Sequence, residues 1–431
     1  MGKVAFMTLG CKVNQDETDS IMELFQQKGY EIVDFSEKAD VYVINTCTVT
    51  QVGSKKSRQM IRRAHRLNPQ ALIAVTGCYS QTASEEVAKI PGVGLIVGNN
   101  QKHNMVTLVE QRLEEQGSKI LVAPRHELNE FHSLPLATLR QRHRATLKIQ
   151  EGCDNFCTYC IVPYARGPIR SKELGEVILD CEKLVQEGYK EVVLTGIHLG
   201  SYGRDLDSQV SLADVVNSLD KISGLNRVRL SSVEPTDFNT HLLTAIKSSS
   251  NICNHFHVPL QSGCDKILDL MGRKYTTDLY LQVINELRDL KKDVAITTDI
   301  MVGFPGETET DFDITMNLVK KANFSDMHVF KYSIREGTPA SKFNDQIPNV
   351  IKERRSTELM NLGLELKKEF INSFIGNKVE VLFEKKSDEY IEGHTSNYIE
   401  VRVIGDETLL GKIREVEITE IIDHKALGKL V

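Results

Sequence analysis

Apolar and polar positions in the first part of the chain follow the patterns of strands and helices in turn. Short apolar runs predict strands at Lys3–Leu9, Val41–Cys47, Ala71–Cys78 and Gly94–Gly98. Apolar residues at helical spacing predict helices at Asn14–Lys28, Ser54–Leu67, Thr82–Lys89 and Val106–Gln116. Repeated strand–helix units form parallel sheets that are covered on both faces. Residues 1–122 are therefore predicted to be an α/β domain.

Residues 123–144 lack this pattern and, with Pro124 and Pro135, are typical of a linker. Six further strands are predicted at Thr146–Gln150, Glu191–Gly196, Arg227–Ser232, His255–Leu260, Val294–Val302 and Met327–Tyr332. Helices are predicted between strands at Glu173–Glu187, Asp278–Leu290 and Glu309–Lys321. Six such units suffice for a partial (β/α)6 barrel, whereas a closed barrel of this type has eight. This barrel is predicted over residues 145–374 and ends in a charged helix at Val350–Phe374.

Residues 375–431 change to an alternation of apolar and polar positions. Strands are predicted at Lys378–Lys386, Tyr390–Thr395, Ile399–Ile404 and Leu409–Ile422, with turns at glycines 393, 405 and 411. Several short strands in so small a segment favour a small all-β barrel.

Composition describes a globular protein, with 41% hydrophobic and 26% charged residues. No apolar run approaches the roughly 18 residues of a membrane helix, and the start lacks a signal-peptide segment. A cytoplasmic location without membrane attachment is therefore expected, where thiols stay reduced. The nine cysteines are then better suited to metal, redox or catalytic use than to disulfides. The net charge of -6 gives no overall case for nucleic acid, so that case must rest on local patches.

The strongest local motif consists of Cys153, Cys157 and Cys160, spaced C-x3-C-x2-C directly after a predicted strand. Such a tight loop can surround one metal centre with three thiolates. Structural zinc almost always has four protein ligands, and no fourth cysteine or histidine lies nearby in the sequence. Three cysteines on a 4Fe-4S cluster leave one iron open to a small molecule. The end of a barrel strand is also where such barrels carry their chemistry.

A second set consists of Cys11, Cys47 and Cys78, each of which follows a predicted strand of the first domain. The C-terminal ends of parallel strands share one edge of the sheet, so these cysteines can converge. The alternative is that a small apolar residue simply packs well at strand ends. Because all three strands show the pattern, convergence on a second cluster is favoured.

The Cys153 motif resembles the signature of radical S-adenosylmethionine (SAM) enzymes, and the two sets together resemble the methylthiotransferases. The segments Thr8–Asn14, Val43–Val49 and Val75–Tyr79 look like the three cluster motifs of that family's N-terminal domain. The resemblance covers essentially the whole chain and implies that the C-terminal barrel is a TRAM domain, an RNA-binding appendage. Family members insert a methylated sulfur into a C–H bond of a modified tRNA adenosine or, in one branch, of a ribosomal-protein aspartate.

Segments 156–167 and 194–203 look most like the branch that acts on threonylcarbamoyladenosine beside the anticodon of tRNA. The resemblance then implies methylthiolation at carbon 2 of the adenine ring, with two 4Fe-4S clusters and two SAM molecules. Cys153, Cys157 and Cys160 would hold the cluster that cleaves SAM. Cys11, Cys47 and Cys78 would hold an auxiliary cluster that is the sulfur reservoir. A monomer is expected, and the electron and sulfur donors are not identified.

Cofactor contacts are also implied by the resemblance. Tyr159, which precedes the last cluster cysteine, is placed for the adenine ring of SAM, and Gly196 is placed for its amino group. Glu234 and Gln261 follow the third and fourth barrel strands, with a capping or turn role as the alternative. Arg166 is expected to bridge the regions of the two clusters.

The remaining cysteines and three histidines near strand ends are expected to be structural. They are Cys181, Cys253, Cys264, His198, His255 and His257.

Basic residues gather near Cys47, since residues 41–84 contain no acidic residue. Lys55, Arg58, Arg62 and Arg66 share one face of a predicted helix, which predicts a tRNA-binding surface. A solvated basic helix is the alternative. A second basic patch is predicted at Arg140, Arg142, His143, Arg144 and Lys148. Residues 371–431 have 8 basic and 12 acidic residues, a net charge of 8 − 12 = -4, so their RNA contacts should be few.

The competing hypothesis is an iron–sulfur protein that senses iron or redox state and holds RNA without turnover. The barrel behind the Cys153 motif argues against a sensor, which needs no barrel mouth.

Overall fold

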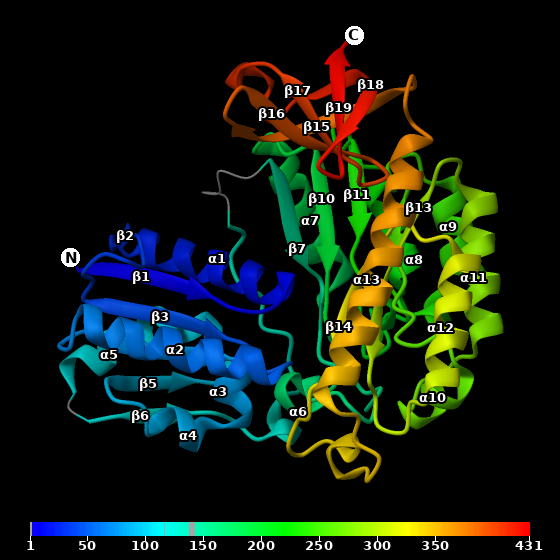
Figure 1. The fold of residues 1–431 in the computed structure, drawn as a ribbon. Helices are drawn as coiled ribbons and strands as arrows, with labels where there is room; N and C mark the ends of the chain where they lie inside the picture. The colour runs from blue at the N-terminus through cyan, green and yellow to red at the C-terminus, as the bar shows by residue number, and fades with distance from the viewer. Residues whose placement is uncertain (1, 116, 138–142) are drawn as a thin grey trace.

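The computed structural model describes residues 2–115, 117–137 and 143–431, which form three parts (Figure 1). An N-terminal parallel sheet lies beside a central β/α barrel, and a closed five-stranded β-barrel lies at one end of the central barrel. The predicted fold class is confirmed. Every helix of the described residues is too short or too polar to cross a membrane.

The N-terminal sheet has six parallel strands in the order β2-β1-β3-β4-β5-β6. They are β1 (Lys3–Thr8), β2 (Glu31–Val33), β3 (Val41–Thr46), β4 (Leu72–Gly77), β5 (Val93–Val97) and β6 (Lys119–Leu121). The central strands β3 and β4 are buried along their whole length, which explains their uninterrupted apolar runs. The sequence did not predict β2 and β6, because each edge strand has only three residues.

Helices cover both faces of this sheet. They are α1 (Lys12–Gln27), α2 (Gln51–Leu67), α3 (Cys78–Thr82), α4 (Ser84–Ala88) and α5 (Met105–Glu114). Ile21 of α1 and Met105 of α5 pack on one face, and Ile61 of α2 and Val87 of α4 pack on the other. The helix predicted at Thr82–Lys89 corresponds to the shorter α4, and α3, which directly follows β4, was not predicted.

Six parallel strands form the central barrel. They are β7 (Arg144–Lys148), β10 (Glu191–Thr195), β11 (Arg227–Leu230), β12 (His255–His257), β13 (Ala295–Val302) and β14 (Asp326–Lys331). Two three-stranded sheets, β11-β10-β7 and β12-β13-β14, are joined by one bridge between Val228 and Ile252. In the described residues β7 does not pair with β14, so the barrel is open on that side. The N-terminal domain lies along this opening (Figure 1).

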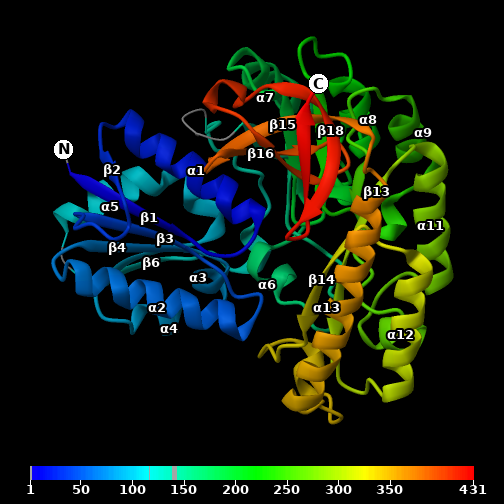
Figure 2. The same cartoon turned by 45° about the horizontal axis from the view of Figure 1, so that its top comes forward.

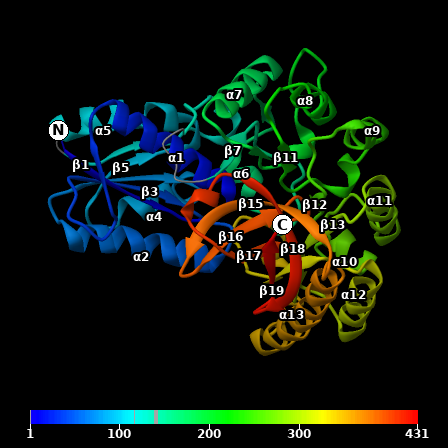
Figure 3. The same cartoon turned by 90° about the horizontal axis from the view of Figure 1, so that it is seen from above.

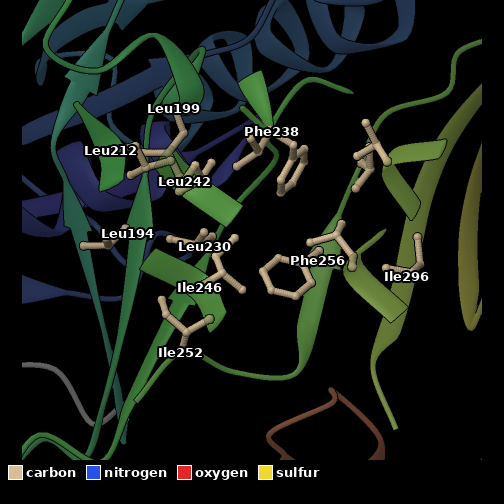
Figure 4. Close-up of a cluster of buried hydrophobic side chains, with 14 of the residues drawn as sticks. Leu194, Leu199, Leu212, Leu230, Phe238, Leu242, Ile246, Ile252, Phe256 and Ile296 are labelled. Carbon is tan, nitrogen blue, oxygen red and sulfur yellow. The ribbon is translucent and has the colours of Figure 1, made fainter. Parts of the chain in front are cut away.

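Helices surround the outer face of the barrel. They are α7 (Leu174–Gln186), α8 (Leu212–Leu219), α9 (Thr240–Ser248), α10 (Asp265–Leu270), α11 (Thr277–Leu290), α12 (Glu309–Ala322) and α13 (Asn349–Asn372). Figure 4 shows Leu212 of α8 and Ile246 of α9 among strand residues such as Leu194 and Leu230, all of them buried. The long helix α13 runs along β14 (Figure 2), where Gly363 permits close approach to Met327.

The C-terminal barrel closes in the order β15-β16-β17-β19-β18. Its strands are β15 (Lys378–Ser387), β16 (Tyr390–Thr395), β17 (Glu400–Ile404), β18 (Ile413–Ile422) and β19 (Lys425–Leu430). The last strand was not predicted. Asp423 and His424 form the turn before it, and both have positive φ although neither is glycine. The turn therefore has no strong sequence signal.

This C-terminal barrel docks on the N-terminal ends of the central strands (Figures 1 and 3). Arg227 and Arg229, near the start of β11, donate to the carbonyl oxygens of His394 and Ser396 at 3.0 and 2.9 Å. The guanidinium of Arg229 also lies 4.7 Å from the centre of the Tyr398 ring. The β16–β17 turn thus covers the floor of the barrel.

Glu191 should stabilise the contact between the two barrels, because it pairs with the arginines at this end of the central barrel. It is fully buried, and its carboxylate lies 2.7 Å from Arg229 and within 4 Å of Arg144 and Arg227. We expect Glu191→Ala to lower the free energy of unfolding by about 3–5 kcal/mol, because it leaves buried guanidinium groups without their carboxylate. Urea denaturation measures this loss. Glu353→Ala, which removes only the exposed pair with Lys331, is the control, and an equal loss in both variants would contradict the account.

Candidate active site between the two domains

Cys11, Cys47 and Cys78 lie together at the edge of the N-terminal sheet that faces the barrel. They follow the neighbouring strands β1, β3 and β4, which end nearly level. The chain before Cys11 lies directly on Cys47, since a Cβ built on Gly10 would be 3.2 Å from the Cys47 sulfur. The structure therefore brings this set together as predicted from the strand ends.

The pKa shifts of two of these cysteines agree with their lying close to the third. Burial raises the pKa of the Cys47 and Cys78 thiols, and the neighbouring Cys11 raises both further. Metal ligation requires thiolates, so a metal centre here must supply the positive charge that makes deprotonation favourable. Arg166 supplies part of it, because its Nε donates to the Cys78 sulfur at 3.2 Å.

Arg166 is fully buried and joins the two domains. It ends the short helix α6 (Val162–Arg166), which directly follows the Cys153–Cys160 loop. Its Nη1 donates to Glu17 of α1 at 2.6 Å and to Glu151 of β8 (Gln150–Glu151) at 2.9 Å. The residue thus lies between the two cysteine sets, as expected.

Glu17 and Glu151 are the carboxylates of a buried ionic network. Burial alone would raise the pKa of Glu17, but Arg166, Lys102 and Lys148 outweigh it and hold this pKa well below the usual range. Burial likewise opposes ionisation of Glu151, yet Arg166 and Lys148 lower its pKa to about 2. Both carboxylates are therefore charged at neutral pH.

The loop that carries Cys153, Cys157 and Cys160 has a tightly constrained backbone. Gly152 has a φ of 75°, and a Cβ there would lie 1.7 Å from the Pro168 carbonyl oxygen, so only glycine fits. The Cys160 amide donates to the Cys157 carbonyl at 2.9 Å. Burial, with Cys157 adding to it, raises the pKa of Cys160 to about 12.

Three thiols in each donor set have the chemistry that an iron–sulfur cluster requires of its ligands. All the cysteines are free thiols, and each set offers three of them. Within the described chain, no three histidine, cysteine or acidic side chains surround the position of one metal ion. The thiolates of a four-iron cluster bind different irons, and three of them leave one iron open.

A cavity of about 730 Å³ lies between the two domains. Thr48, Tyr79 and Ile161, which line it, are the residues that directly follow Cys47, Cys78 and Cys160. The opposite wall is the segment after β14, whose Ser333 hydroxyl accepts from the Gln51 amide at 3.1 Å. The cavity is therefore bounded by both domains, and residues next in sequence to a cysteine of each set line it.

Comparisons with known proteins agree with this arrangement. Residues 3–98 match the uncharacterized protein family UPF0004, and residues 147–319 match the radical SAM superfamily. The chain is 44% identical over 424 residues to threonylcarbamoyladenosine tRNA methylthiotransferase MtaB of Bacillus subtilis (strain 168), a match that covers 97% of this chain and 94% of that protein. The chain belongs to the radical SAM methylthiotransferase family.

Other relatives lie in two groups of this family. The protein of the same name from Aquifex aeolicus (strain VF5) is 41% identical, over 93% of this chain and 96% of that protein. The tRNA-2-methylthio-N(6)-dimethylallyladenosine synthase of Alkaliphilus oremlandii (strain OhILAs) is 35% identical, over 100% and 93%. Among solved structures, the radical SAM methyltransferase TsrM from Kitasatospora setae shares the fold, with a TM-score of 0.59, 15% identity, and coverage of 79% and 77%.

The four residues predicted to contact SAM lie around the Cys153–Cys160 loop and the strand ends of this radical SAM barrel. Tyr159 packs edge-on against Phe304, with ring centres 6.4 Å apart. Gly196 lies against Gln150, where a Cβ would be 2.8 Å from the amide oxygen. Gln261 has a positive φ of 62°, an uncommon conformation for this residue type.

Glu234 is connected to the cysteines through a residue that the sequence did not single out. It forms an ion pair with Arg273, whose Nη1 also donates to the Cys157 sulfur at 3.4 Å. His198 was expected to be structural, but its Nδ1 lies 3.9 Å from the Cys153 sulfur. Burial opposes its protonation, whereas Asp237 and Cys153 raise the pKa of His198 to about 9. Its place two residues after Gly196, at a strand end, was the available signal.

The predicted basic surfaces have different outcomes. Lys55 and Arg58 of α2 line the cavity, while Arg62 and Arg66 are exposed farther along the same helix. The second patch is a wrong prediction as far as it is described, because Arg144 pairs with Glu384, and Lys148 with Glu17 and Glu151. Of its other members, Arg140 and Arg142 lie outside the described residues.

Acid should weaken the domain interface at Arg166. Because the pKa values of Glu17 and Glu151 are lowered on folding, their contribution to stability is present above about pH 4.5 and lost as the pH falls toward 2. We expect the free energy of unfolding to decrease over this window. Glu17→Gln should be less stable at neutral pH and should lose less stability on acidification. Urea titrations at several pH values measure both, and identical pH dependence in the variant would contradict the account.

Proposed function

We propose that the protein methylthiolates threonylcarbamoyladenosine beside the tRNA anticodon, at carbon 2 of the adenine ring, with two 4Fe-4S clusters and two SAM molecules. The observation that carries this proposal is the pair of three-cysteine sets, one on each domain, with residues next in sequence to each set lining one cavity. Action as a monomer is proposed with it.

Cys153, Cys157 and Cys160 would hold the cluster whose open iron binds SAM, and Cys11, Cys47 and Cys78 would hold the auxiliary cluster. When bound, these groups supply the one-electron chemistry that removes hydrogen from an unreactive carbon, and the sulfur that replaces it. An acid–base pair cannot activate so strong a C–H bond, so no residue is proposed as a catalytic acid or base.

The protein's own part is to hold the two sets in place and to control their charge. Arg273 and Arg166 donate to the sulfurs of Cys157 and Cys78, and His198 brings a positive charge beside Cys153. Hydrogen bonds and charges at the sulfurs tune cluster potentials. Tyr159, Gly196, Glu234 and Gln261 are proposed to contact SAM, on the strength of their places around this loop.

The substrate follows from the relatives and from accessibility. Proteins named for threonylcarbamoyladenosine are 44% and 41% identical to this chain, against 35% for one named for dimethylallyladenosine. An adenosine beside the anticodon lies in a single-stranded loop, so its base can enter the cavity without breaking a helix.

Domain boundaries at residues 1–122, 145–374 and 375–431, with a linker at 123–144, complete the proposal. They agree with the end of β6 at Leu121, the start of β7 at Arg144 and the end of α13 at Asn372. RNA contacts of the acidic TRAM-like barrel are proposed to be few, so that α2 provides the main tRNA surface through Lys55, Arg58, Arg62 and Arg66.

Cysteine substitutions should separate the roles of the two sets. We expect Cys153→Ala to abolish reductive cleavage of SAM, and Cys11→Ala to retain cleavage but to stop thiolation of tRNA. Anaerobically reconstituted wild type should contain about eight irons, and each variant about four. Cys181→Ala, in the buried face of α7, is the control and should retain both activities. Loss of cleavage in a folded Cys11→Ala variant would contradict this division, and a single cluster in the wild type would refute the proposal.

The exposed end of α2 should bind tRNA phosphates. We expect Arg62→Glu/Arg66→Glu to weaken tRNA binding and to reduce the slope of log K against log salt by about 0.7–0.9 for each phosphate that the helix no longer neutralises. Filter binding at several salt concentrations measures the slope. Lys292→Glu alters a side chain that is 92% exposed, away from α2, and should leave the slope unchanged. An unaltered slope in the α2 variant would exclude this surface.

A further inference from the structure

The cavity between the two domains is lined by three basic and two acidic residues among those that the structure describes. Lys55 and Arg58 project from α2, and Arg335 comes from the segment after β14. Among the described residues that line it, only Glu86 and Glu336 are acidic. Glu86 is already engaged, because its carboxylate accepts from the Tyr79 hydroxyl at 2.9 Å.

Neither guanidinium group of this cavity has a carboxylate partner in the part of the chain that the structure describes. Arg58 donates to the Tyr79 hydroxyl at 3.1 Å, and Arg335 donates to the hydroxyls of Thr48 and Ser54. The Nε of Arg335 is buried and makes no hydrogen bond within the described structure. A buried N–H that lacks an acceptor costs free energy unless a ligand supplies one.

Three other arginines of the protein differ from Arg58 and Arg335 in having a carboxylate partner. Arg166, Arg229 and Arg273 are more deeply buried than the partly exposed Arg58 and Arg335, and each forms an ion pair with a glutamate. Arg58 and Arg335, by contrast, repel each other: burial lowers the pKa of Arg335, and Arg58 is among the groups that lower it further. Two guanidinium groups at one cavity, neither of them ion-paired within the described residues, are suited to binding an anion.

We propose that Arg58 and Arg335 bind the carboxylate of the threonyl group of the substrate, an inference that rests on the proposed function. The threonylcarbamoyl group brings a carboxylate to the adenosine, whereas the dimethylallyl group is an uncharged hydrocarbon. A guanidinium fork matches a carboxylate in geometry and charge. Residues that directly follow cysteines of both sets line the cavity, so a modified base anchored there lies beside the segments that carry the proposed clusters.

A phosphate of the RNA backbone carries the same kind of charge, so the test must separate the two sources. Three anticodon stem-loop RNAs of one sequence serve this purpose. The adenosine carries threonylcarbamoyl in the first, the corresponding uncharged threonine amide in the second, and dimethylallyl in the third. Binding to the reconstituted holoenzyme is measured by fluorescence anisotropy.

We expect the wild type to bind the first RNA at least tenfold more tightly than the other two. Arg58→Gln and Arg335→Gln should both lose most of this preference. Arg335→Gln, which lies outside the proposed tRNA surface of α2, should also bind the amide RNA within about twofold of the wild type. A variant that weakens all three RNAs alike would indicate a phosphate contact and overturn the proposal. Retention of the full preference in both variants would also overturn it.

Two controls make the result specific. Arg62→Gln lies on the same helix but does not line the cavity, so it should weaken all three RNAs equally and keep the preference. Because Arg335 contacts Thr48 beside Cys47, iron content is measured in each variant, and Arg58→Gln keeps the proposal testable if Arg335→Gln does not fold.

The outcome also distinguishes this inference from the proposed function. If the wild type does not methylthiolate the threonylcarbamoyl RNA, the proposed function itself fails. If it does so while both arginine variants keep their preference, only the carboxylate site is refuted.

Discussion

The guanidinium of Arg166 has no access to solvent and lies where the N-terminal sheet meets the barrel. A buried cation is tolerated only when anions and acceptors surround it. Here Glu17 comes from one domain, Glu151 from the other, and the Cys78 sulfur from the edge of the sheet. Movement of one domain relative to the other would leave at least one of these charges unpaired. The network therefore fixes the distance between two sets of cysteines that are remote in the sequence.

The open side of the barrel makes this arrangement possible. A closed barrel would surround its interior with strands, whereas here β7 and β14 do not pair within the described residues, which leaves room for the edge of a second sheet. Lys148 of β7 reaches Glu17 of α1, and Arg335, which follows β14, reaches Thr48 after β3. The two margins of the opening are thus attached to the N-terminal domain on both sides of the cavity.

The strands and the convergence of the cysteines that follow them could be predicted from the sequence, because both depend on local patterns. Parallel strands place their C-terminal ends at one edge, so cysteines after three strands had to be neighbours in the fold. The contacts that support them could not be predicted in this way. Arg273 reaches Cys157 across 116 residues of chain, and Arg335 reaches Thr48 across 287. The second basic patch was predicted wrongly for the same reason, because the acidic partners of Arg144 and Lys148 come from distant segments.

The place of the C-terminal barrel bears on how an acidic protein can hold tRNA. Its β16–β17 turn covers the N-terminal ends of the barrel strands, while the Cys153–Cys160 loop follows β8 at the opposite ends. Residues 371–431 also have a net charge of 8 − 12 = -4, which repels phosphate. The basic helix α2, in contrast, begins four residues after Cys47 and lines the cavity. For the tRNA of the proposed function, a loop guided by charge would therefore meet α2 first, with the modified base directed toward the cavity between the two domains.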